Sequence, residues 1–126
     1  MYQAYGLIRP NSDFTFPVLL ERLKVKLPHL NLQNDGDQIV LSSEDWEIHL
    51  SLNSDPSVLT ESQEIAEKIA GIEDGSDIAS CNRRIEIASD SDDPVMEHFN
   101  DYLIVVEVVQ SFRGVIGIEP SEPSLL

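Results

Sequence analysis

The residues most able to do chemistry gather in one stretch, residues 88–103, with the sequence ASDSDDPVMEHFNDYL. Six side chains in this stretch are carboxylates or an imidazole: Asp90, Asp92, Asp93, Glu97, His98 and Asp101. These groups are ligands of divalent metal ions and are also common general acids and bases. Three interpretations are open: a metal site, a catalytic site, or the acidic start of a helix.

The spacing of the acidic residues does not favour a metal site. An EF-hand calcium loop needs acids at positions 1, 3 and 5, glycine at position 6 and glutamate at position 12. Counted from Asp90, Pro94 and Val95 fall where the loop needs an acid and the glycine of its sharp turn. The Glu-x-x-His motif of helical di-metal sites does not occur in the sequence. We therefore expect neither a metal site nor a cofactor.

A catalytic site is not favoured either. His98 and Asp101 lie three residues apart, so they can touch on a helix, but no nucleophile is identifiable beside them and an exposed helical histidine is the simpler interpretation. The sequence contains no phosphate-binding glycine loop and no Gly-x-Ser-x-Gly motif. The single cysteine, Cys81, is expected to be a buried, inert thiol. We predict a non-enzymatic protein without catalytic residues.

The third interpretation places the start of a helix in this stretch. Asp93-Pro94 has the arrangement of an N-cap followed by a first-turn proline, and Asp55-Pro56 repeats it earlier in the chain. The pattern predicts a helix over residues 94–112, with Glu97 in its first turn, where carboxylates interact favourably with the helix dipole. Asp90 and Asp92 are then residues of a solvated turn.

The apolar pattern of the remaining chain predicts the elements that position this stretch. Alternation and turn residues predict strands at 2–8, 30–33, 38–42, 46–52, 78–89 and 115–120. Helical spacing predicts two further helices, at about 16–27 and 55–71. The order β-α-β-β-β-α-β-α-β predicts an α+β two-layer sandwich with three helices and a mixed or antiparallel sheet of five to six strands. We expect one domain over residues 1–120 and a loose tail over residues 121–126.

The charge of the chain restricts its partners. Twenty-three acidic residues face eight basic ones, which gives a net charge of −15. Binding to nucleic acid or to an anionic membrane surface is disfavoured, because both depend on Lys and Arg. A basic protein would be attracted, although the same charge also serves solubility. No apolar run approaches the ~20 residues of a membrane span, and the lone cysteine and the absence of a signal-peptide pattern favour the cytoplasm.

The predicted third helix offers both charge and apolar surface to a partner. Its acidic candidates are Asp90, Asp92, Glu97 and Asp101, and the candidate apolar anchors are Val105, Val108 and Phe112 on a second edge. A helix that is apolar nearly all round is either buried on two sides within its own domain or covered by a partner. We expect a small acidic protein-binding domain, for example an immunity- or antitoxin-like inhibitor of a basic protein. A homodimeric accessory or structural subunit is the alternative, and an enzyme with an unrecognised site is the third.

Overall fold

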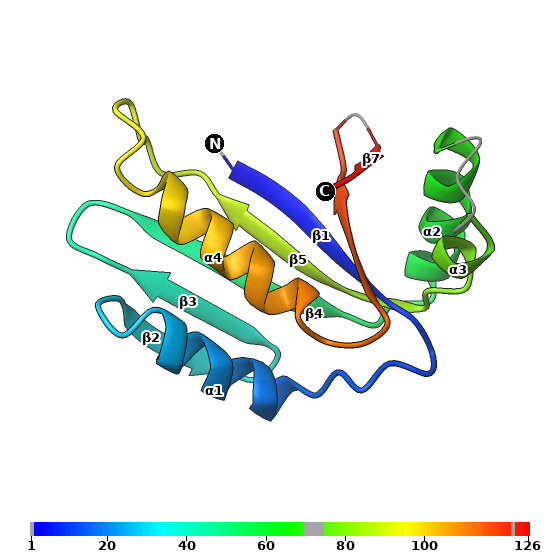
Figure 1. The fold of residues 1–126 in the computed structure, drawn as a ribbon, viewed down its shortest axis with the longest axis horizontal. Coiled ribbons are helices and arrows are strands. Elements are labelled where there is room, and N and C mark those ends of the chain that lie inside the picture. The colour runs from blue at the N-terminus through cyan, green and yellow to red at the C-terminus, as the bar shows by residue number, and fades with distance from the viewer. Residues whose placement is uncertain (1, 70–74, 122) are drawn as a thin grey trace.

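The computed structural model describes residues 2–69, 75–121 and 123–126. Its strands are β1 (Tyr2–Ile8), β2 (Asn31–Asp35), β3 (Gln38–Ser42), β4 (Glu47–Asn53), β5 (Arg83–Ser89), β6 (Val115–Glu119) and β7 (Ser124–Leu125). Its helices are α1 (Phe16–Lys26), α2 (Ser57–Lys68), α3 (Gly75–Ala79) and α4 (Phe99–Gln110). The predicted α+β class is confirmed, with more strands and helices than expected (Figure 1).

The seven described strands form one sheet in the order β2-β3-β4-β5-β1-β6-β7, and every described pairing is antiparallel. The hairpin between β2 and β3 turns at Gly36, whose positive φ of 59° suits the predicted Asn-Asp-Gly-Asp turn. Strands β5 and β6 both flank β1, so α4 links two strands that run parallel to each other with β1 between them. The predicted loose tail contains β7, which pairs with the end of β6.

Helices α1 and α4 lie side by side on one face of the sheet (Figure 1). The alternation along β4 explains why this face is covered: Ile48 and Leu50 are buried beneath the helices, whereas Glu47 and His49 are exposed on the opposite face. Leu19 and Leu23 supply the buried stripe of α1, as the helical spacing predicts. Close approach of α4 requires a glycine in β1, because a Cβ at Gly6 would collide with Val109.

Helices α2 and α3 pack against each other rather than against α1 and α4. Together with residues of β1 and β6 they form a second apolar cluster, whose buried members are Leu7, Ile65, Ile69, Ile78, Cys81 and Ile118. The predicted strand start at residue 78 is wrong, because helix α3 extends to Ala79 and strand β5 begins only at Arg83. Ile78 and Cys81 pack into this cluster as part of α3 and the following turn. The predicted helix stop at Gly71 lies outside the described residues. Cys81 is fully buried as expected, and burial raises the pKa of its thiol to about 11.

The helix predicted from Asp55-Pro56 begins at Ser57. Oδ1 of Asp55 accepts a hydrogen bond from the backbone N–H of Ser57 at 2.9 Å, which lowers the pKa of this carboxyl. Arg84, nearly buried on β5, joins α2 to the sheet through an ion pair of 2.8 Å to Glu61, and Glu86 on the same strand holds the guanidinium at 2.8 Å.

Candidate functional site

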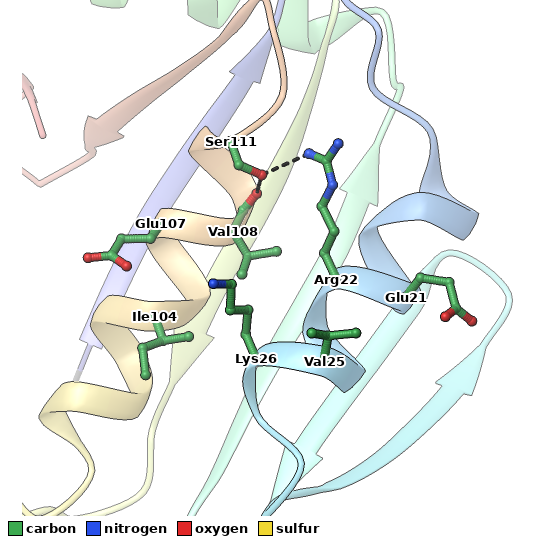
Figure 2. Close-up of a pocket in the computed structure, with 8 residues that line it drawn as sticks. All are labelled: Glu21, Arg22, Val25, Lys26, Ile104, Glu107, Val108 and Ser111. Carbon is green, nitrogen blue, oxygen red and sulfur yellow. Dashed lines mark hydrogen bonds between the residues drawn. The ribbon is translucent and has the colours of Figure 1, made fainter.

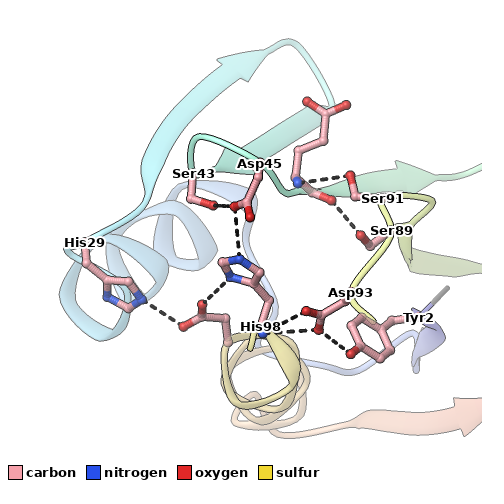
Figure 3. Close-up of polar contacts among 10 residues, drawn as sticks. Tyr2, His29, Ser43, Asp45, Ser89, Ser91, Asp93 and His98 are labelled. Atoms are coloured by element: carbon pink, nitrogen blue, oxygen red, sulfur yellow. Dashed lines mark hydrogen bonds and ion pairs between the residues drawn. The ribbon is translucent and has the colours of Figure 1, made fainter. Parts of the chain in front are cut away.

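The acidic stretch does not start a helix at Asp93-Pro94. Helix α4 begins at Phe99, so the predicted start at residue 94 is wrong by five residues. Met96, with a φ of 57°, takes the chain out of helical geometry, and a turn forms instead between the carbonyl of Asp93 and the N–H of Met96. The carboxylate of Asp93 accepts hydrogen bonds from the Tyr2 hydroxyl and from the backbone N–H of His98. It therefore ties β1 to the start of α4 (Figure 3).

His98 is the centre of this region rather than an exposed helical histidine. Only 15% of its side chain is exposed, and its ring stacks on the buried Trp46 ring with centroids 4.7 Å apart and planes 3° apart. Nδ1 of His98 lies 3.2 Å from Oδ2 of Asp101. Nε2 faces Oδ1 of Asp45 at 3.4 Å (Figure 3), an ion-pair contact, and has no hydrogen-bond partner among the described residues.

Asp101 connects two histidines. Its Oδ1 lies 2.8 Å from Nε2 of the exposed His29, while Oδ2 contacts His98, and only 14% of the Asp101 side chain is exposed. Burial alone lowers the pKa of His98, but the carboxylates of Asp101, Asp45 and Asp93 outweigh it and raise that pKa above its usual value. The pair of His98 and Asp101 considered from the sequence therefore exists, and the ring nitrogen opposite Asp101 faces a carboxylate rather than a nucleophile.

Three side chains of this region could hold a metal ion. Asp45, Glu97 and His98 each offer one ligand atom, and these atoms lie within 4.8 Å of one another. Sequence reasoning missed Asp45 and Trp46 because they precede His98 by about fifty residues and reach it only through the pairing of β4 with β5. Tyr2 and His29 were missed because each is also far in the chain from its partner, 91 residues from Asp93 and 72 residues from Asp101 respectively. Short-range spacing carries no signal for any of the four.

The turn before β4 and the loop after β5 form one acidic end of the sheet. Hydrogen bonds between serine side chains and the backbone of Glu47 join them: the Ser89 hydroxyl donates to the carbonyl of Glu47, and the N–H of Glu47 donates to Oγ of Ser91. We define the acidic end by its exposed carboxylates, which are Glu44, Asp45, Glu47, Asp90, Asp92 and Glu97. Segments 43–47 and 89–102 contain neither lysine nor arginine.

Two apolar side chains project from the same loop. Val95 is 71% exposed and Met96 is 56% exposed, next to Glu97 in the chain. Of the acidic residues predicted to contact a partner, Asp90, Asp92 and Glu97 are exposed, whereas Asp101 is mostly buried between two histidines. Sequence reasoning missed Val95 and Met96 as surface residues because it placed them in the first turn of a helix.

The predicted apolar anchors Val105, Val108 and Phe112 are not at the surface. Their exposed fractions are 0%, 4% and 3%, because α4 packs on the sheet on one side and on α1 on another. Phe112 meets the Phe14 ring edge-on at a centroid distance of 4.9 Å, and the Arg22 guanidinium covers it at 4.2 Å. Of the two interpretations of this edge, burial within the domain and cover by a partner, the exposed fractions agree with burial within the domain.

A shallow pocket of about 570 Å³ lies between α1 and α4 (Figure 2). Its lining combines the apolar Val25 and Ile104 with the polar groups of Arg22 and Lys26. Arg22 donates a hydrogen bond to the Ser111 hydroxyl at 2.8 Å, so its guanidinium is already engaged by the protein.

None of the helices in the described ranges has the length and hydropathy needed to cross a membrane. Comparisons with models of protein families, with curated proteins and with solved structures found no match to this chain.

Proposed function

We propose that this protein is a non-enzymatic binding domain that docks a basic protein at its acidic end. One observation carries the proposal: the two segments of the acidic end hold six exposed carboxylates, and the exposed side chains of Val95 and Met96 belong to the second segment. Lysine and arginine are missing from both segments. An apolar contact within a charged rim is the usual arrangement of a protein interface.

The two parts of this surface have different physical roles. The exposed carboxylates accelerate the encounter with a basic partner and make association sensitive to salt. Apolar side chains that become buried at the centre of an interface contribute most of the affinity. Val95 and Met96 take the role that sequence reasoning assigned to Val105, Val108 and Phe112.

An immunity- or antitoxin-like inhibitor is the concrete form of this proposal, because a nuclease that binds nucleic acid needs a basic face, and the acidic end would cover it. Homodimerisation was predicted through the second edge of α4. The residues that would form this dimer contact, Val105, Val108 and Phe112, are all buried in the protein's own core.

The first test concerns the apolar contact. The tagged protein is used to capture a partner from its native extract, and the same capture is repeated with the double variant Val95→Ser, Met96→Asn. Asparagine is chosen because it tolerates the positive φ of Met96. Val25→Ser is the matched control, since Val25 is 72% exposed on α1. We expect a basic partner that the double variant loses and the control retains. Capture that survives in the double variant contradicts the proposal.

The second test concerns the charge. Asp90→Lys with Asp92→Lys reverses two carboxylates of the acidic end, and Asp35→Lys with Asp37→Lys makes the same change in net charge at the distant β2–β3 hairpin. Stopped-flow association with the captured partner should slow about tenfold at low salt for the first pair only. Raising the ionic strength should remove most of the difference. Equal slowing by both pairs would mean that net charge alone attracts the partner.

A further inference from the structure

The side chains of Asp45, Glu97 and His98 converge although they come from separate parts of the chain. Asp45 lies in the turn before β4, whereas Glu97 and His98 immediately precede α4. Their ligand atoms lie within 4.8 Å of one another. Two ligands of one zinc ion, each about 2.1 Å from it, are at most about 4.2 Å apart. The exposed carboxylates of Asp45 and Glu97 therefore need only a small rotation to share an ion with His98.

The ring of His98 is held in the orientation that metal-ligating histidines require. Stacking on Trp46 fixes its plane, and the contact of Nδ1 with Asp101 fixes its rotation. Asp101 is itself held by His29 at 2.8 Å. A ligating histidine almost always donates its second ring N–H to a carboxylate, a backbone carbonyl or water. Asp101 is a carboxylate in this position, and its contact with His29 helps to hold it there.

The second ring nitrogen of His98, Nε2, faces a carboxylate without a hydrogen bond to it. Nε2 is buried and lacks a hydrogen-bond partner among the described residues, yet it points at Oδ1 of Asp45 from 3.4 Å. When Nδ1–H donates to Asp101, the neutral ring turns the lone pair of Nε2 toward a carboxylate oxygen, which is also electron-rich. A proton on Nε2 or a cation between the two groups removes this repulsion.

We propose that His98, Asp45 and Glu97 bind one divalent transition-metal ion, with zinc as the preferred ion. An imidazole nitrogen combined with two carboxylate oxygens suits zinc and related ions, whereas calcium and magnesium prefer oxygen ligands alone. Three protein ligands leave a coordination position open to water or to a group from another molecule. This site does not depend on the proposed protein partner.

Isothermal titration calorimetry and thermal melting with zinc chloride, in a buffer that does not bind zinc, test this site. We expect one zinc ion per chain and a rise in melting temperature of about 10 °C at zinc concentrations a hundredfold above the dissociation constant. Magnesium at the same concentration should have little effect. Cobalt(II) bound to the protein should give a visible absorption spectrum that zinc abolishes by displacement.

Variants identify the ligands. Asp45→Asn and Glu97→Gln alter exposed side chains and should keep the fold, as circular dichroism can verify, while zinc affinity falls at least tenfold. His98→Gln should abolish binding. His49→Gln is the matched control, because His49 also contacts a carboxylate, Glu47 at 3.1 Å, but on the exposed face of β4. The absence of one-to-one zinc binding, or binding that survives both carboxylate variants, would overturn the site. Loss of binding in His49→Gln would do the same.

Discussion

The replacement Phe112→Ala distinguishes most sharply between a buried edge of α4 and an edge that binds a partner. Phe112 is 3% exposed, packs edge-on against Phe14 and lies beneath the Arg22 guanidinium. Removing a buried phenylalanine side chain costs about 3–5 kcal/mol. This range already includes the loss of the contact with the Phe14 ring, which contributes about 1 kcal/mol. We therefore expect the free energy of unfolding to fall by about 4 kcal/mol.

Equilibrium urea denaturation measures this loss directly. With an m-value of about 2 kcal/mol per molar urea, the midpoint should fall by about 2 M at an unchanged slope. Leu103→Ala is the matched control on the same helix, because Leu103 is 40% exposed, and it should cost about 1 kcal/mol or less. A loss below 1 kcal/mol for Phe112→Ala would refute the reasoning, and so would a wild-type dimer that this variant splits in light scattering.

Three smaller predictions follow from individual groups. Millimolar calcium or magnesium should shift the melting temperature only slightly, and a large calcium-specific shift that disappears in Asp92→Asn would contradict this. The Cys81 thiol, with its pKa raised to about 11 by burial, should react with iodoacetamide at neutral pH far more slowly than after unfolding in urea, and equal rates would show that it is accessible. Because the pKa of Asp55 is lowered in the folded state, its ionised form stabilises the fold above the unfolded pKa of about 3.9 and ceases to do so as the pH falls through the folded value. Asp55→Asn should therefore be less stable than wild type at pH 7 and equally stable at pH 2 in denaturation experiments.

The local sequence pattern was sufficient to predict elements whose structure depends on neighbouring residues alone. The alternation of Ile48 and Leu50 with Glu47 and His49 predicts a strand with one exposed face, and β4 has that arrangement. The turn at Gly36 was predictable for a similar reason, because its conformation depends on residues beside it. These are cases in which propensity and tertiary packing favour the same structure.

The start of α4 was not predictable from the same signals. Asp93-Pro94 has the sequence of a helix start, as Asp55-Pro56 does, yet Asp93 instead accepts hydrogen bonds from Tyr2 and from the His98 backbone. Tyr2 lies 91 residues away in the chain, so this competing partner is invisible to any local pattern. The same limitation hid Asp45 and Trp46 from the candidate site.

The edge of α4 shows why an apolar pattern alone leaves its partner open. Val105, Val108 and Phe112 indicate a buried surface, but the pattern does not say whether the covering element comes from the same chain. The contact between α1 and α4 is tertiary packing that a local pattern does not reveal, and it makes these residues part of the core. Val95 and Met96 are exposed because α4 begins at Phe99, so they lie in the loop before the helix rather than in its first turn.

Hydrogen–deuterium exchange of the complex with the captured partner tests the proposed binding surface most directly. Residues 43–47 and 90–98 should become protected in the complex, because they form the acidic end and include the exposed Val95 and Met96. The β2–β3 hairpin and the exposed turns of α1 should exchange as in the free protein. Protection confined to the pocket between α1 and α4, with no change in residues 90–98, would contradict the account.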